Sequence, residues 1–171
     1  MERRTPSAVT VRPYRSEDWD AIARIHDTAR LGELRCSVGV EAFLTLAETH
    51  EEEGLFDGEL WVAEVAEVAE VADGAGPEPV VAGFAAFADA ELTWLYVDPA
   101  RQRQGIGRVL LGHVLEADDS ARIELTVLAG NDNARALYES AGFVVVETKS
   151  GKLAGNERFA ATGHVMEWHR P

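Results

Sequence analysis

The segment VDPARQRQGIGRVLLGHVLE, residues 97–116, constrains the fold more than any other part of the chain. A strand-like run ends before Pro99, glycines follow at Gly105 and Gly107, and apolar residues then recur at helical spacing. Glycine has no Cβ, so a ligand can approach its backbone closely. A turn that leads into a helix also directs unpaired N–H groups and the positive end of the helix dipole at one point. The segment therefore predicts a phosphate site, although a plain strand–turn–helix junction has the same pattern.

Positive charge gathers around this turn in an otherwise acidic chain, at Arg101, Arg103 and Arg108. The residues themselves exclude two common phosphate-binding motifs. A dinucleotide fingerprint needs a third glycine three residues after Gly107, where this chain has Leu110. A Walker loop needs Gly-Lys-Ser or Gly-Lys-Thr, which does not occur in the sequence. The phosphate therefore belongs to another class of ligand.

The length and charge of the chain limit the classes of partner. With 171 residues, of which 46% are hydrophobic, we expect one domain, residues 1–171, around a full core. The net charge is −14, so we expect neither nucleic acid nor an anionic membrane surface as a partner. The same charge would draw a cationic substrate such as an amine into an acidic cleft, or it only keeps the protein soluble.

The cysteine content and the N-terminal residues indicate a cytoplasmic protein. Cys36 is the only cysteine, so no disulfide can form within the chain, and we expect a buried structural thiol in a reducing compartment. Histidine and cysteine show no metal-ligand spacing, so we expect no metal. The first 13 residues lack the apolar segment of a signal peptide, and no apolar run approaches the ~20 residues that span a bilayer.

Hydrophobic periodicity predicts the order of the elements. Strands are expected at 9–13, 60–65, 80–88, 91–97, 122–129, 143–150 and 163–168. Helices are expected at 16–30 with Ser16 as N-cap, at 37–54 as one helix or two short ones ending at Gly54, from Gly105 onward, and at 132–142. The Ala-Glu-Val repeat of 62–72 extends a strand or its loop, residues 73–80 form a turn, and residues 151–162 form a loop. This order predicts a mixed, largely antiparallel sheet with helices on both faces.

Two motifs resemble those of the GCN5-related N-acetyltransferase (GNAT) superfamily. The stretch LYVDPARQRQGIGRVLL is similar to motif A of that family, in which Arg or Gln precedes Gly-x-Gly after a strand. Gln102, Gly105 and Gly107 take those positions. The stretch VLAGNDNARALYESAGF is similar to motif B, with Asn131 and Tyr138 seven residues apart. The resemblance follows the element order over 9–146 and is specific over 92–143.

The resemblance implies an α/β fold, α+β in type, with a mostly antiparallel central sheet of six to seven strands, splayed central strands and flanking helices on both faces. It also implies that acetyl-CoA binds as co-substrate. Its pyrophosphate would lie on the backbone amides of the glycine turn, namely Gln102, Arg103, Gln104, Gly105, Ile106, Gly107 and Arg108. Its pantetheine would pair with the backbone of Leu95, Tyr96 and Val97, near Asn131 and Ala134. Asn131 either binds the pantetheine or only caps the helix that follows.

The resemblance also suggests the catalytic groups. Tyr138 matches the family tyrosine whose hydroxyl protonates the leaving thiolate, although a packed helix tyrosine would give the same pattern. Glu91, six residues before Val97, matches a family glutamate that deprotonates the amine, and ordered water is the alternative. Strand alternation places Glu91 on the same face as Leu95 and Val97, with Trp94 on the other.

Glutamates are frequent between residues 31 and 53, at Glu33, Glu41, Glu48, Glu51, Glu52 and Glu53. They form either an acidic rim that suits a cationic amine or an ordinary solvated helix face. We therefore expect an N-acetyltransferase that acetylates a primary amine directly, with a small molecule as acceptor. A protein or peptide N-acetyltransferase, or an acyl-CoA-binding sensor without turnover, stays open, as does a homodimer.

Overall fold

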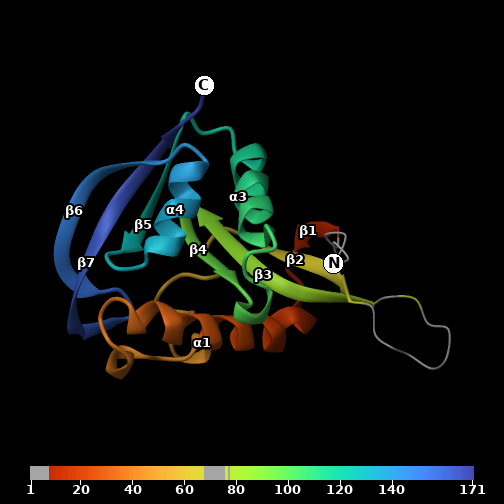
Figure 1. The fold of residues 1–171 in the computed structure, drawn as a ribbon, viewed down its shortest axis with the longest axis horizontal. Coiled ribbons are helices and arrows are strands. Elements are labelled where there is room, and N and C mark those ends of the chain that lie inside the picture. Colours follow the sequence, from red (N-terminus) through yellow and green to blue (C-terminus); the bar gives the residue numbers. More distant parts are fainter. Residues whose placement is uncertain (1–7, 68–75, 77) are drawn as a thin grey trace, which may run out of the picture.

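The computed structural model describes residues 8–67, 76 and 78–171 (Figure 1). One seven-stranded sheet runs through it, in the order β1-β2-β3-β4-β5-β7-β6. Its strands are β1 (Val9–Pro13), β2 (Glu59–Glu67), β3 (Glu78–Ala88), β4 (Glu91–Val97), β5 (Arg122–Leu128), β6 (Val144–Leu153) and β7 (Asn156–His169). Its helices are α1 (Trp19–Arg35), α2 (Leu46–Thr49), α3 (Ile106–Ala117) and α4 (Asp132–Ser140). Neighbouring strands are antiparallel except for β4 and β5, which are parallel. The predicted fold class is confirmed.

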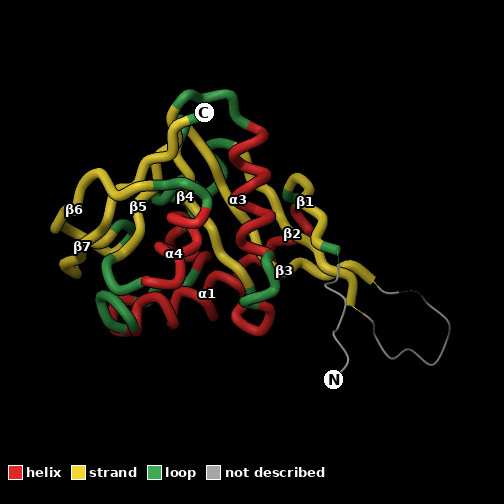
Figure 2. Tube along the Cα trace, turned by 45° about the horizontal axis from the view of Figure 1, so that its top comes forward, coloured by secondary structure: helices red, strands yellow, loops and turns green. Residues whose placement is uncertain are grey.

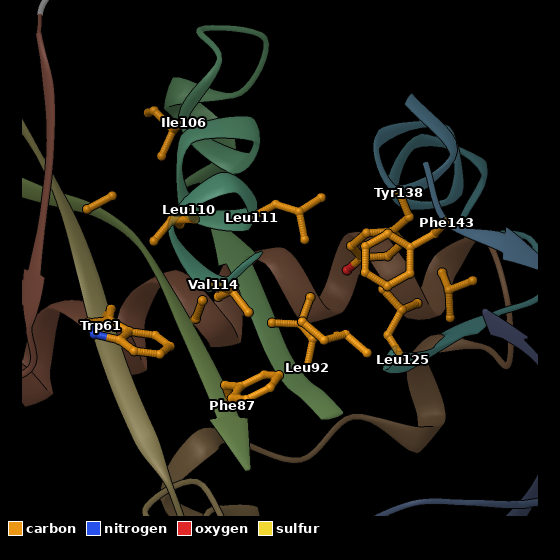
Figure 3. Packing of buried hydrophobic residues seen from close by; sticks show 14 of the residues in the cluster. Trp61, Phe87, Leu92, Ile106, Leu110, Leu111, Val114, Leu125, Tyr138 and Phe143 are labelled. Atoms are coloured by element: carbon orange, nitrogen blue, oxygen red, sulfur yellow. The ribbon is translucent and has the colours of Figure 1, made fainter. Parts of the chain in front are cut away.

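Two apolar clusters hold helices against the two faces of the sheet. On one face, α3 buries residues at helical spacing, Ile106, Leu110, Leu111 and Val114. They pack with Leu92 and with Tyr138 of α4, as Figure 3 shows. On the other face, Ile22 and Ile25 of α1 pack on Val62, Phe84 and Trp94. Burial of both sheet faces explains why Leu60–Ala63 of β2 and Ala82–Phe87 of β3 are continuous runs of buried residues.

The central strands β4 and β5 separate soon after they begin. Their register contains the single pair Glu91↔Glu124, where the Glu124 N–H donates to the Ala90 carbonyl at 3.0 Å. Beyond that pair the two strands share no ladder, so the edge of β4 that faces β5 lacks a strand partner. The predicted splay is therefore present, and it opens a gap in the middle of the sheet.

A β-bulge in β4 corrects the predicted side-chain alternation. Ala86 of β3 lies opposite Trp94 and Phe87 lies opposite Leu92, so Thr93 is an extra residue. Leu92 consequently packs on the same face as Leu95 and Val97, the face covered by α3. Because neighbours along a strand alternate, Glu91 lies on the opposite face, with Trp94 and Tyr96. The prediction that Glu91 shares a face with Leu95 and Val97 is wrong, because simple alternation cannot anticipate a bulge.

The prediction of a loop at 151–162 is also wrong. Strand β6 continues to Leu153 and β7 begins at Asn156, so the segment forms a tight hairpin (Figure 2). Gly155 at its tip has φ +74°, a conformation that glycine adopts without strain. The polar composition that suggested a loop reflects an edge strand whose residues are largely exposed.

Smaller differences concern element boundaries. Ser16 opens a 3₁₀ turn, Ser16–Asp18, and Asp18 is the N-cap of α1. The region 37–54 contains two short helices, a 3₁₀ turn at Val40–Ala42 and α2, and Gly54 closes the following turn with φ +63°. The Ala-Glu-Val repeat continues β2 to Glu67, and its remainder lies outside the described residues. Of the predicted turn at 73–80, residues 73–75 and 77 also lie outside them, and residues 78–80 already belong to β3.

Candidate functional site

Two cavities open on the gap between β4 and β5. The first has a volume of about 1070 Å³ and lies between the end of α1, β4, the glycine turn, β5 and α4. The second has a volume of about 510 Å³ and lies between α1, the region around α2, the starts of β4 and β5, and the β6–β7 hairpin. The residues that line both cavities mark where they meet: Glu33, Leu92, Thr93, Trp94, Tyr96 and Thr126. A group held in one cavity can therefore reach a group held in the other.

The glycine turn forms one end of the first cavity, between β4 and α3. Within residues 8–67, 76 and 78–171, none of the seven backbone amides from Gln102 to Arg108 donates a hydrogen bond. The first amide of α3 that does so is Val109, which donates to the Gly105 carbonyl at 3.1 Å. Free amides at the N-terminus of a helix bind anions, because they add directed donors to the helix dipole. The turn therefore has the properties of a phosphate cradle.

The two glycines of this turn are required for different reasons. Gly105 caps α3 in the left-handed region with φ +83°, next to Arg103, which has φ +66°. Gly107 has ordinary backbone angles, but a Cβ there would lie 3.1 Å from Cδ2 of Leu137. Gly105 thus shapes the turn, whereas Gly107 allows α3 to approach α4, and the two helices lie side by side in Figure 1.

Most of the predicted turn residues line the first cavity. They are Gln102, Arg103, Gly105, Ile106, Gly107 and Arg108. Gln104 is exposed and does not line it. Of the three arginines, Arg101 binds Glu67 at 2.9 Å, whereas Arg103 and Arg108 make no ion pair in the described part of the chain. Two cations are therefore free to face an anion at this end.

Tyr138 projects from α4 into the apolar layer under the sheet and also lines the first cavity. Its ring packs edge to face on Phe143, with 6.0 Å between the centroids. Figure 3 shows its oxygen pointing away from α4, toward the side of α3. Burial, and then the negative charge of Glu33, raise the pKa of the Tyr138 hydroxyl, so it stays protonated at neutral pH. The hydroxyl can therefore act as a proton donor inside the cavity.

Asn131 is the N-cap of α4. Its Oδ1 accepts a hydrogen bond from the Ala134 amide at 3.4 Å, and both residues line the first cavity. The capping alternative is thus present in the structure. The backbone of Leu95, Tyr96 and Val97 lines the same cavity, on the edge of β4 that lacks a partner. An extended ligand could add to this edge as a short strand does.

Glu91 lies in the second cavity and does not line the first. Burial, and then the charge of Glu124 opposite it, raise its pKa. Glu91 is exposed and lies at the end of the gap where β4 and β5 still pair. Its role as a base stays a prediction.

The sequence analysis did not predict a partly buried polar cluster at the junction of the cavities. Glu33 of α1 accepts hydrogen bonds through Oε2 from Nη1 of Arg30 at 2.7 Å and from the Tyr96 hydroxyl at 3.0 Å. Its side chain is only 16% exposed. Burial, and then Glu33, raise the pKa of Tyr96 well above its usual value. Glu33 and Glu53 both line the second cavity, so these two glutamates are not part of a solvated helix face.

The other glutamates of that region, Glu41, Glu48, Glu51 and Glu52, are exposed, as the solvated-face alternative predicts. No sequence pattern links Glu33 to Tyr96, because they are 63 residues apart and meet only through the packing of α1 on β4. Cys36, expected to be buried, is exposed at the edge of the first cavity. It follows the last turn of α1, where no further turn covers it.

Within the described residues, no group of three or more histidine, cysteine or carboxylate side chains is arranged to hold a metal ion. A membrane-spanning helix is likewise not found among them, since none is both long and apolar enough.

Comparison with known proteins identifies the family of this chain. Residues 56–145, more than half of the chain, match the family model described as an acetyltransferase (GNAT) domain. The [ribosomal protein bS18]-alanine N-acetyltransferase of Escherichia coli is 50% identical over 58 residues, which cover 32% of this chain and 39% of that enzyme. The mycothiol acetyltransferase of Beutenbergia cavernae is 36% identical over 106 residues, covering 58% of this chain and 35% of that enzyme. The chain thus spans less than half of the length of these relatives.

A solved structure extends the likeness to nearly the whole fold. The structure of yncA from Salmonella typhimurium with its cofactor acetyl-CoA has a TM-score of 0.64 and 22% sequence identity, and the match covers 95% of this chain and 94% of that one. The family match spans β2 to the start of β6 and thus contains both the glycine turn and the Asn131–Tyr138 helix. The chain therefore belongs to the GNAT acetyltransferase family.

Proposed function

We propose that the protein is an acetyl-CoA-dependent N-acetyltransferase that transfers an acetyl group directly to a primary amine. The observation that carries this proposal is the run of seven free backbone amides, Gln102 to Arg108, at one end of a cavity that meets a second cavity at the gap between β4 and β5. Membership in the GNAT family supports it, and so does the similar fold of yncA, whose structure carries acetyl-CoA.

The proposed pose follows the first cavity from end to end. The pyrophosphate lies on the amides of the glycine turn, with Arg103 and Arg108 nearby. The pantetheine runs along the free edge of β4, past Leu95, Tyr96 and Val97, with Asn131 and Ala134 across from it. The thioester then lies at the gap, beside Tyr138, and the amine enters from the second cavity.

The chemistry needs a proton acceptor for the amine, donors for the developing oxyanion and a proton for the leaving thiolate. Backbone amides of β4 near Tyr96 or Val97 supply the oxyanion donors. Tyr138, which the raised pKa keeps protonated, donates to the thiolate. The proton acceptor is a carboxylate of the second cavity, for which the family resemblance suggests Glu91.

The acceptor follows from the second cavity. Its volume of about 510 Å³ suits a small molecule, and its carboxylates Glu33, Glu53, Glu91 and Glu124 outnumber the cations Arg30, Lys149 and Lys152. We therefore propose a small cationic amine. A second candidate is the N-terminus of a protein, which the local similarity to the bS18-alanine enzyme favours.

The test measures thiol release from acetyl-CoA with amino acids, polyamines, aminoglycosides and short peptides, while calorimetry follows acetyl-CoA binding. Turnover with small amines supports the first candidate, and turnover with peptides alone supports the second. Tight binding of acetyl-CoA without turnover on any acceptor would favour a sensor. Absence of binding contradicts the proposal.

A further inference from the structure

Glu53 is a carboxylate of the second cavity to which no role has yet been given. It follows α2 in the turn that Gly54 closes. Its carboxylate fills the space that a Cβ on Gly155 would occupy, so it lies against the tip of the β6–β7 hairpin. The side chain is thus held between two elements that wall the cavity, and it makes no hydrogen bond or ion pair with any described residue. The carboxylate can therefore still accept a hydrogen bond from a ligand in the cavity.

Glu33 and Glu53 are both affected by the charge of Arg30, but only Glu33 forms an ion pair with it. Arg30 gives its guanidinium to Glu33 at 2.7 Å, and Glu33 also holds the Tyr96 hydroxyl. Glu53 receives no such donor, although the charges of Arg30 and Glu33 both act on it. An ion-paired carboxylate is a poor base, whereas a partly buried carboxylate without donors is a good one.

We propose that Glu53 is the general base of the acetyl transfer, accepting a proton from the ammonium group of the acceptor directly or through one water. The proposal rests on the proposed function and assigns a residue to one of its steps. The ammonium would approach Glu53 in the second cavity and present its nitrogen at the junction, beside Glu33 and Tyr96.

The protons and bonds of the reaction balance in this scheme. Glu53 takes one proton from the ammonium, and the neutral amine then forms a C–N bond to the thioester carbonyl. When the tetrahedral adduct collapses, the C–S bond breaks, and the thiolate takes a proton from the Tyr138 hydroxyl. After the collapse the nitrogen still carries two hydrogens and a positive charge. It gives one proton to the Tyr138 oxygen and becomes the neutral amide, and Glu53 releases its proton to solvent.

The electrostatics of the cavity support this assignment. Burial raises the pKa of Glu53 to about 7; Arg30 opposes the shift, and Glu33, Glu157 and Glu52 add to it. A base with a pKa near the working pH is half ionised there and still accepts a proton readily. The other titratable groups that line the cavity are His26, Glu91, Tyr96, Glu124, Lys149 and Lys152. Glu91, the alternative base, is exposed at the paired end of the gap.

The experiment compares Glu53→Gln, Glu91→Gln and Glu52→Gln with the wild type. Glutamine keeps the shape of the side chain, and Glu52 is an exposed neighbour that serves as the matched control. The rate kcat/KM is measured from pH 5.5 to 9 at saturating acetyl-CoA, with the panel amine that gives the fastest thiol release. Calorimetry of acetyl-CoA binding verifies that each variant retains the first cavity.

In the wild type we expect kcat/KM to rise with pH through about 7, because the active form is the ionised carboxylate. We call this rise of kcat/KM at low pH the acidic limb. In Glu53→Gln the acidic limb should disappear, and kcat/KM should fall about 100-fold or more, as removal of a general base does. Glu52→Gln should keep the rate and the limb, with the limb at slightly lower pH, because the charge of Glu52 adds to the raised pKa of Glu53. A further variant, Glu53→Asp, should retain the limb at a lower rate.

Loss of the limb in Glu91→Gln but not in Glu53→Gln would overturn the proposal in favour of Glu91. An unchanged limb in both variants would point to ordered water and also overturn it. Either result leaves the acetyltransferase function intact, because wild-type turnover establishes that function independently. A wild type that binds no acetyl-CoA would instead contradict the function itself.

Discussion

Two tyrosines line the first cavity, and their hydroxyls differ in whether they already have a hydrogen-bond partner. Tyr138 is buried and Tyr96 is partly buried, and burial raises the pKa of each. The Tyr96 hydroxyl already donates to Glu33 at 3.0 Å. The Tyr138 hydroxyl donates to no group in the part of the chain that the structure describes, and it lines the first cavity. Tyr138 is therefore the hydroxyl available to an incoming sulfur.

Tyr138→Phe removes that hydroxyl and keeps the ring that packs on Phe143. We expect kcat to fall about 100-fold, since a general acid contributes about that much or more. The dissociation constant of acetyl-CoA, measured by calorimetry, should change little. Tyr14→Phe, which lies outside both cavities, is the control. Unchanged turnover in Tyr138→Phe would remove Tyr138 from the mechanism.

At the scale of elements, we propose that the glycine turn and α3 form one anion-binding unit. A Cβ on Gly105 would meet no atom within 4 Å, so a larger side chain there would not clash with the rest of the protein. Gly105→Glu adds a negative charge where the phosphates are expected and also imposes a left-handed φ on glutamate. We expect acetyl-CoA binding to become undetectable by calorimetry.

Gly112→Glu is the matched control for this prediction. Gly112 lies in the same helix, away from the turn, and a Cβ there also meets no atom within 4 Å. That variant should bind acetyl-CoA as the wild type does. Normal binding in Gly105→Glu would show that the turn does not hold the phosphates.

The elements also show which features a sequence can predict. The turn and α3 were predictable because their signals are local: two glycines and apolar residues four apart. The splay of β4 and β5 came only from family resemblance. The bulge at Thr93 and the Glu33–Tyr96 contact were not predictable, because each depends on strand register or on the packing of distant segments. The strands at 143–150 and 163–168 were predicted, but their continuation through 151–162 was missed, because its polar residues resemble a loop.

At the scale of the whole molecule, the two cavities meet through the gap in the sheet, so the proposed acetyl-CoA and amine could occupy them at the same time. Direct transfer then needs no acyl-enzyme. Cys36, the only cysteine, is exposed at the edge of the first cavity and is the one thiol that could carry an acetyl group. We expect Cys36→Ser to keep kcat within about twofold and initial-rate plots to intersect. Parallel plots together with an inactive Cys36→Ser would indicate a covalent intermediate.

The free energy of unfolding should also depend on pH because of Glu53. The fold raises its pKa from 4.5 to about 7, so the native state binds more protons than the unfolded chain between these values. The free energy of unfolding therefore falls as pH rises through this window, and the penalty is complete above pH 7. A shift of this size corresponds to at most about 3 kcal/mol, and partial exposure reduces it to about 1–2 kcal/mol.

Glu53→Gln removes this ionisation, so its stability relative to the wild type isolates the effect from that of the other carboxylates. Urea denaturation at pH 4.5 should give nearly equal free energies of unfolding, whereas at pH 8 the variant should be more stable by about 1–2 kcal/mol. Glu52→Gln should show a much smaller pH-dependent difference, because Glu52 is the weakest of the charges that add to the raised pKa of Glu53. A pH-independent difference for Glu53→Gln, or a loss of stability at pH 8, would mean that the ionised carboxylate is not strained by its site. A gain in stability together with a loss of turnover is the pattern expected of a group that the fold holds at a cost for catalysis.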